Sequence, residues 1–183
     1  ERLRSGRFTL AVVGEFKRGK STLINALLGQ DVFPTDVLPT TATLNRLVYS
    51  LEQGVELHYR DGRSERIALS QLRDYVTKLD EEAAQRAAQI REAVVYFPCQ
   101  YCRNNVELID TPGLQDESAM TDVTMQVLPQ VDAAILVISA LSPLSESEML
   151  FLEQLGYGQC AKLFIVVGSI DRLNDPQQVD RLL

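Results

Sequence analysis

The sequence predicts an α/β fold in which a mostly parallel central sheet is flanked by helices. Apolar runs of strand length alternate along the chain with segments of helical periodicity, which is the pattern of an α/β protein. Two of these runs, 133–138 and 162–167, are unbroken, as is typical of parallel strands buried on both faces. A glycine-rich loop joins the first expected strand to the first expected helix. Together these observations indicate one α/β domain.

The expected elements follow one another in a regular order. Strands are expected at residues 8–13, 44–50, 55–59, 64–68, 94–97, 106–109, 133–138 and 162–167. Helices are expected at residues 20–28, 72–79, 81–91, 120–128 and 144–155. Ser145 and Glu148 have the spacing of a capping box at the start of the last helix. Asp61-Gly62 predicts a tight hairpin turn, and residues 30–43 are expected to form an exposed loop.

The composition excludes some classes of partner. The chain has 183 residues, 45% of them apolar, which is enough for a sizeable core, and its net charge is -7. This acidity argues against a general attraction to nucleic acid or anionic lipid. Six of the 18 basic residues nevertheless lie in the first twenty positions, so positive charge is concentrated around the glycine loop. No apolar run reaches the roughly 20 residues of a membrane-spanning helix, and we expect a cytoplasmic protein.

The three cysteines predict neither a disulfide framework nor a metal site. Cys99 and Cys102 form one CxxC pair, but a structural zinc site needs two further ligands. Cys160 and His58 are the remaining candidates, and neither has metal-ligand spacing. His58 alternates with the apolar residues of an expected strand, so an ordinary strand position explains it.

The glycine loop has the spacing of a P-loop. Gly14, Gly19, Lys20 and Ser21 match GxxxxGK[ST], in which backbone N–H groups turn inward around phosphate oxygens. We expect Lys20 to bridge the β- and γ-phosphates of a nucleotide and the Ser21 hydroxyl to ligate Mg²⁺. The alternative is a chance glycine turn, which the expected strand before the motif and the helix after it argue against. The residues predicted to contact the nucleotide here are Gly14, Glu15, Phe16, Lys17, Arg18, Gly19, Lys20, Ser21 and Thr22.

A second motif, Asp110-Thr111-Pro112-Gly113, directly follows the expected strand 106–109. This is the place of a metal-binding aspartate in a P-loop fold, so Asp110 is predicted to hold Mg²⁺. The N–H of Gly113 is predicted to contact the γ-phosphate and to sense whether it is present. Alone, the four residues would be compatible with a plain turn; together with the P-loop they indicate one nucleotide site.

Three segments in this order, GEFKRGKSTLINALLG, VLPTTAT and IDTPGL, resemble the GTPase domain of the dynamin superfamily, above all its bacterial dynamin-like members. The resemblance covers nearly the whole chain, including the stretch 52–105 between the last two segments. It implies a P-loop GTPase fold with an inserted hairpin and helices between two nucleotide-sensing loops, switch I and switch II. It also implies GTP hydrolysis with Mg²⁺ that is stimulated when two GTPase (G) domains pair, and membrane remodelling by attached helical segments.

The resemblance also assigns roles to single residues. Thr41 best matches the switch-I threonine whose hydroxyl ligates Mg²⁺, and Thr40 is the alternative in the neighbouring register. Lys17 stands where atlastins and guanylate-binding proteins, whose P-loop is similar, carry an arginine finger, and Arg18 is its neighbour. Lysine cannot fork onto phosphate oxygens as a guanidinium does. Four possibilities stay open: Lys17 supplies a point charge, Arg18 acts as the finger, the compensating charge comes from elsewhere, or both cations only solvate the loop and raise nucleotide affinity.

The fourth GTPase motif, usually [NT]KxD, corresponds to Gly168-Ser169-Ile170-Asp171, in which the aspartate alone is kept. Asp171 is predicted to accept hydrogen bonds from guanine, with a weakened selectivity, and a simple turn residue is the alternative. Leu114 occupies the place of the catalytic glutamine of small GTPases, and an apolar side chain cannot orient water. We therefore expect low basal turnover.

Taken together, residues 1–183 are expected to form one G domain that stops inside a helix after the fourth motif, without a stalk or membrane-binding region. The predicted function is a dynamin-like GTPase that binds guanine nucleotide and a second G domain, but no nucleic acid. Peripheral membrane contact is expected only through regions outside this sequence. The alternatives are a nucleotide-gated interaction module with negligible hydrolysis and, third, an ATPase.

Overall fold

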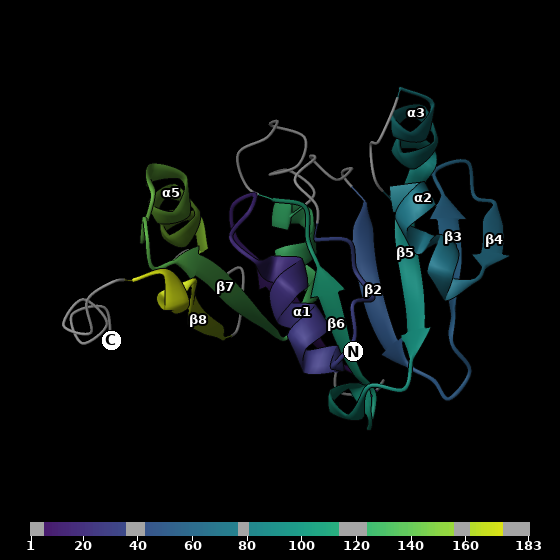
Figure 1. The fold of residues 1–183 in the computed structure, drawn as a ribbon, viewed down its shortest axis with the longest axis horizontal. Coiled ribbons are helices and arrows are strands. Elements are labelled where there is room, and N and C mark those ends of the chain that lie inside the picture. Colours follow the sequence, from purple (N-terminus) through teal and green to yellow (C-terminus); the bar gives the residue numbers. More distant parts are fainter. Residues whose placement is uncertain (1–5, 36–42, 77–80, 114–123, 156–161, 174–183) are drawn as a thin grey trace.

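One large sheet forms the centre of the molecule. The computed structural model describes residues 6–35, 43–76, 81–113, 124–155 and 162–173. Within these ranges eight strands form a single sheet in the order β4-β3-β5-β2-β6-β1-β7-β8 (Figure 1). The strands are β1 (Phe8–Val13), β2 (Leu44–Tyr49), β3 (Gly54–Tyr59), β4 (Ser64–Ile67), β5 (Ile90–Phe97), β6 (Val106–Asp110), β7 (Ala133–Ser139) and β8 (Leu163–Gly168). The predicted strands are therefore all present.

The sheet is mostly parallel at its centre. Strands β6, β1, β7 and β8 run parallel to one another, and β2 runs parallel to β5. The remaining pairs, β2 with β6, β3 with β4 and β3 with β5, are antiparallel. The β3–β4 hairpin turns at Asp61-Gly62, where Gly62 has a φ of 90°. The predicted α/β class, the central parallel sheet and the inserted hairpin are confirmed.

Helices lie on both faces of this sheet, and each face forms a hydrophobic core with the helices that cover it. The helices are α1 (Lys20–Leu28), α2 (Leu72–Val76), α3 (Glu81–Gln89) and α5 (Glu146–Leu155), and residues 124–127 are also helical. One core joins α1 and α2 to one face, with Ile24 and Leu72 only 1% exposed. The other core joins α5 and residues 124–131 to the opposite face, with Leu128 fully buried. Alternation of side chains along the strands explains this division, since Val12 belongs to the first core and Ala11 and Val13 to the second.

The expected boundary between helix and strand near residue 90 differs most from the structure. The helix expected at 81–91 ends at Gln89, and the strand expected at 94–97 begins at Ile90. Residues 90–92 pair with β3 and β2, as in the pairs Ile90 with Tyr59 and Glu92 with Leu44. Ladder hydrogen bonds to two neighbours therefore outweigh the helical preference of the alanine-rich segment that comes before.

The prediction that the run 162–167 is buried on both faces is wrong. Strand β8 is parallel, as expected, but among the described strands it lies at the edge of the sheet and pairs with β7 alone. Phe164 is 56% exposed and Ile165 is 51% exposed. Strand β7, between β1 and β8, has the predicted character, because all but one of its residues are buried.

The remaining predictions on composition can also be compared with the structure. Cys99 and Cys102 are free and buried, and burial together with the neighbouring Cys99 raises the pKa of Cys102 to about 12. Such a thiol stays protonated at neutral pH. His58 lies in β3 and its Nδ1 is 3.0 Å from Ser64 Oγ, as expected of an ordinary strand residue. In the described part of the chain, no helix has the length and apolar character needed to cross a bilayer.

Candidate functional site

The predicted P-loop connects β1 to α1 at the carboxyl end of the central strands. Gly14 is required by a close approach, because a Cβ there would lie 2.4 Å from the carbonyl oxygen of Val137 in β7. Gly19 has a φ of 93° and forms the N-cap of α1, which is the left-handed backbone region that glycine adopts at little cost. The strand, the glycine loop and the helix are thus arranged as the motif predicts, with the positive end of α1 at the loop.

Lys20 reaches back into this loop. Its ammonium Nζ donates hydrogen bonds to the carbonyl oxygens of Gly14, at 3.0 Å, and Glu15, at 2.9 Å. The side chain is nearly buried, at 8% exposure. A fixed positive charge inside a ring of backbone groups is the arrangement that binds a phosphate anion.

Asp110 ends β6 directly opposite the start of α1. Its Oδ2 accepts a hydrogen bond from Ser21 Oγ at 2.9 Å, whereas Oδ1 is buried without a hydrogen-bond partner. Burial raises the pKa of Asp110 to about 6, although the charge of Lys20 and the hydrogen bond from Ser21 act in the opposite direction. An uncompensated buried carboxylate oxygen is costly, so this position favours a cation.

The oxygens of Ser21 and Asp110 fit Mg²⁺. Thr43 and Asn45 line the same cavity, and Thr43 Oγ1 and Asn45 Oδ1 are also buried without a hydrogen-bond partner. Across the ranges described, no cluster of three His, Cys, Asp or Glu side chains exists that could hold a metal by itself. Mg²⁺ prefers oxygen ligands and is usually held by one or two carboxylates together with substrate phosphates, and this site contains one carboxylate, Asp110, and the hydroxyl of Ser21.

The segment after Asp110 packs directly against the P-loop. Thr111 is buried, and its N–H and hydroxyl both donate to the carbonyl oxygen of Val12, at 3.3 Å and 2.9 Å. Gly113 lies so close to the loop that a Cβ there would be 2.8 Å from the nitrogen of Phe16. The predicted nucleotide contact of Gly113 is therefore compatible with its place, and a larger residue would push the two loops apart.

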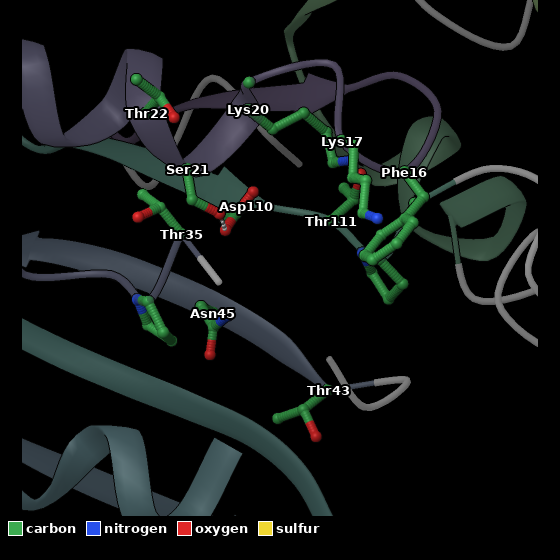
Figure 2. A pocket seen from close by; sticks show the side chains of 14 residues that line it. Phe16, Lys17, Lys20, Ser21, Thr22, Thr35, Thr43, Asn45, Asp110 and Thr111 are labelled. Carbon is green, nitrogen blue, oxygen red and sulfur yellow. Dashed lines mark hydrogen bonds between the residues drawn. The ribbon is translucent and has the colours of Figure 1, made fainter. Parts of the chain in front are cut away.

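A cavity opens between these loops and the start of β2 (Figure 2). Eight of the predicted site residues line it: Phe16, Lys17, Gly19, Lys20, Ser21, Thr22, Asp110 and Gly113. Six other residues in its lining have no role predicted from the sequence: Pro34, Thr35, Thr43, Asn45, Thr111 and Pro112. Thr35 and Thr43 lie within the loop expected at residues 30–43, so their position in the sequence was a usable signal. Thr40 and Thr41 themselves lie outside the described residues, as does Leu114.

The two cations inside the P-loop lie in different surroundings. Lys17 is exposed, has a φ of 61°, lines the cavity and has its Nζ 5.3 Å from the centre of the Phe16 ring. The Arg18 side chain is 12% exposed and forms ion pairs with Glu15 and Glu148. Glu15 and Arg18 do not belong to the cavity lining, although both were expected near the nucleotide.

Asp171 lies at the other end of the candidate site. It is exposed in a short 3-10 helix, Ile170–Arg172, that follows β8. The end of β8 reaches the P-loop, since a Cβ on Gly168 would lie 3.5 Å from the carbonyl oxygen of Arg18. Asp171 is not part of the cavity lining. The structure thus places the fourth motif beside the P-loop. It shows no contact between Asp171 and the part of the candidate site around Lys20 and Asp110, which we call the phosphate end.

Comparison with known proteins adds to this geometry. Residues 10–170 match the profile described as "Dynamin family". The chain is 33% identical over 192 residues to a bacterial dynamin-like protein of Nostoc punctiforme, covering 98% of this chain and 28% of that protein. It is 29% identical over 183 residues to a probable transmembrane GTPase, FZO-like and chloroplastic, of Arabidopsis thaliana, covering 96% of this chain and 16% of that protein. The chain therefore spans less than a third of each of these two relatives.

A solved structure shows the same fold. It is described as an oligomerised bacterial dynamin pair that provides a mechanism for the long-range sensing and tethering of membranes. The superposition has a TM-score of 0.73 at 21% sequence identity and covers 96% of this chain and 27% of the other. At this identity the likeness concerns the fold.

Proposed function

Since the chain belongs to the dynamin family, we propose that this G domain binds GTP together with Mg²⁺ and hydrolyses the bond to the γ-phosphate. The observation that carries the proposal is the joint placement of Lys20, Ser21 and Asp110. A buried ammonium, a hydroxyl and a half-satisfied carboxylate meet where the P-loop opens α1. This combination suits a phosphate chain and its cation.

In this proposal each group of the phosphate end has one task. The backbone N–H groups of the loop and the N-terminus of α1 bind the β-phosphate, and Lys20 exchanges its carbonyl contacts for β- and γ-phosphate oxygens. Ser21 and Asp110, with the switch-I residue Thr41 or Thr40, would hold Mg²⁺, which neutralises negative charge on the phosphate oxygens. Gly113, already close to Phe16, offers its N–H to the γ-phosphate.

Selectivity for guanine is assigned to Asp171. A carboxylate can accept hydrogen bonds from guanine N1 and N2, whereas adenine presents no donor there. Gly168 and Ser169 lack the amide and ammonium groups that usually accompany this aspartate, so the preference for GTP over ATP is proposed to be modest. Competition between the two nucleotides for the same site distinguishes this proposal from the ATPase alternative.

Pairing of two G domains is proposed as the step that raises turnover. Support comes from the family and from the absence of a water-orienting glutamine after the second motif, where Leu114 stands. The test is GTP turnover per molecule as a function of protein concentration. Specific activity that rises with concentration supports pairing, and a flat specific activity over a hundredfold range contradicts it.

A nucleotide-gated interaction module with negligible hydrolysis is the second candidate. Two features favour this candidate. Leu114 stands where a water-orienting glutamine would support hydrolysis, and neither this residue nor the reduced fourth motif prevents nucleotide binding. Incubation of the protein with a stoichiometric amount of GTP separates the two functions. The hydrolase releases orthophosphate and GDP within minutes to hours, whereas the interaction module keeps GTP intact. Membrane remodelling, and a cytoplasmic location with peripheral membrane contact, are proposed only for the whole protein.

A further inference from the structure

Two P-loop residues, Glu15 and Arg18, do not line the candidate nucleotide cavity. They contact the first turn of α5 instead. The guanidinium of Arg18 pairs with the Glu15 carboxylate through Nη2, and its Nε lies 3.0 Å from Glu148 Oε1. The hydroxyls of Ser145 and Ser147 both donate to Glu15 Oε1. Residues about 130 positions apart in the chain are thereby joined into one cluster, which we call the loop–α5 cluster: Glu15, Arg18, Ser145, Ser147 and Glu148.

The loop–α5 cluster is buried and its charges depend on one another. Glu148 is fully buried and Glu15 is 5% exposed, while Arg18 is the cation placed between them. Burial raises the pKa of Glu15, but hydrogen bonds from Ser145 and Ser147 and the charge of Arg18 outweigh it and hold this pKa below its usual value. Removal of one partner would leave a buried charge without compensation, which is strongly unfavourable.

Glu148 is fixed by its own helix. Its Oε2 accepts a hydrogen bond from the N–H of Ser145 at 3.0 Å, and its N–H donates to Ser145 Oγ at 3.3 Å. This is the capping box that the sequence predicts, here with the second carboxylate oxygen directed at Arg18. Glu148 is therefore held in place by hydrogen bonds to Ser145 at the start of its own helix as well as by the ion pair with Arg18.

The cluster holds the P-loop on the side that faces away from the cavity. Phe16 and Lys17 line the cavity, whereas Glu15 before them and Arg18 after them are attached to α5. Lys17 is held at a φ of 61°, a backbone conformation that residues other than glycine seldom adopt. Such a conformation persists where the surroundings fix it, and the two flanking attachments do so here.

From this geometry we propose that Arg18 is a positioning residue. It acts through the loop–α5 cluster to set the backbone of residues 15–18 for nucleotide phosphates, and it does not contact phosphate itself. Lys17 is then the cation inside the P-loop that faces the nucleotide. The inference rests on the proposed function, because it concerns how the same site binds guanine nucleotide.

The test compares Arg18→Ala, Glu148→Gln and the double variant with the wild-type chain. GDP and GTP dissociation constants and kcat are measured with a fluorescent nucleotide and an orthophosphate assay. If Arg18 positions the loop, each single variant weakens GDP and GTP by similar factors of about ten to a hundred, the scale reached by a displaced positioning group. The double variant then binds nucleotide no more weakly than the single variant with the lower affinity, because the two substitutions break the same cluster.

A finger role would give a different pattern. Arg18→Ala would then leave GDP affinity unchanged and lower kcat by about 10³ or more, while Glu148→Gln would have little effect. That result overturns the proposal. Glu146→Gln is the matched control, since Glu146 lies in the same turn of α5 but is exposed, and it is expected to behave like the wild-type chain.

Two further measurements keep the test decisive. If Arg18→Ala does not fold, the test is made with Glu148→Gln and Ser147→Ala, because each of these substitutions nearly keeps the shape of the original side chain. Wild-type GDP affinity in both of these folded variants overturns the proposal. If the wild-type chain binds neither GDP nor GTP, the proposed function fails; if it binds both and the cluster variants match it in every constant, the positioning role alone fails.

Discussion

The two ends of the candidate site differ in how firmly the fold holds them. At the phosphate end, Lys20 donates hydrogen bonds to the P-loop backbone and Ser21 donates one to Asp110, next to the central strands β1 and β6. At the other end, Asp171 is exposed after β8, an edge strand with half-exposed apolar side chains. The proposed phosphate and metal contacts are therefore built into the core, whereas the proposed base contact depends on an element that the described fold supports from one side only.

The largest expected effect is at Lys20. Lys20→Ala removes the ammonium that lies inside the P-loop, and we expect GTP and GDP affinity to fall by more than about a hundredfold, since a buried charge–phosphate contact is lost. Lys162→Ala, in an exposed lysine next to β8, is the matched control. Titration with a fluorescent guanine nucleotide measures both. Affinity for GTP within a factor of three of the wild-type value in Lys20→Ala would refute the P-loop assignment.

Asp110→Asn is expected to change stability and ligand binding in opposite directions: the protein without Mg²⁺ becomes more stable at neutral pH, and binding of Mg²⁺ with GTP is lost. The folded-state pKa of Asp110 is about 6, above the ordinary value of 3.8, so the folded chain binds this proton more tightly than the unfolded chain. The contribution of Asp110 to the free energy of unfolding therefore falls as the pH rises from about 4 to about 6, by roughly 3 kcal/mol. Without Mg²⁺, Asp110→Asn should be more stable than the wild-type chain at pH 7.5 and nearly equal to it at pH 4.

Denaturant unfolding at the two pH values in the presence of a chelator measures this difference. Asp31→Asn, in an exposed aspartate outside the metal site, serves as the control and should not reproduce it. Asp110→Asn should also lose the stabilisation that Mg²⁺ and GTP together give to the wild-type chain. A lower stability of Asp110→Asn than of the wild-type chain at pH 7.5 would show that the buried carboxylate is compensated by contacts other than a cation.

The difference between the two ends also explains which features the sequence could predict. The P-loop, Asp110 and the capping box at Ser145 were predictable, because each depends on a local pattern within a few residues. The contacts of Arg18 with Glu148 were not, since they join segments that only the folded sheet brings together. The exposure of Phe164 depends on strand order, which an apolar run does not encode. The resemblance to the dynamin superfamily is confirmed by the family match.

Asp171 gives the next prediction, with a smaller effect. Asp171→Asn should weaken GTP binding by about ten- to a hundredfold, the worth of a hydrogen bond to a charged group, and should leave ATP binding unchanged. The neighbouring exposed residue Arg172, changed to Gln, is the control. Competition of GTP and ATP against a labelled guanine nucleotide measures the preference. Equal loss for both nucleotides would mean that Asp171 supports the loop and does not recognise the base.

Phe164→Thr should have the smallest effect. The side chain is 56% exposed on the edge strand β8, and threonine retains a preference for strands. The free energy of unfolding is expected to change by less than about 0.5 kcal/mol, and GTP affinity should not change. Urea unfolding measures the first quantity and nucleotide titration the second. A loss of several kcal/mol would show that the edge of the sheet is supported as firmly as its centre.

The most direct test of the phosphate end as the functional centre is orthophosphate release from GTP, followed with and without Mg²⁺ in the wild-type chain and in Lys20→Ala. We predict release by the wild-type chain at a concentration that allows G domains to pair, and release at the background rate when Mg²⁺ is chelated or Lys20 is replaced. Release that continues at the wild-type rate in Lys20→Ala, or in the absence of Mg²⁺, would contradict the account.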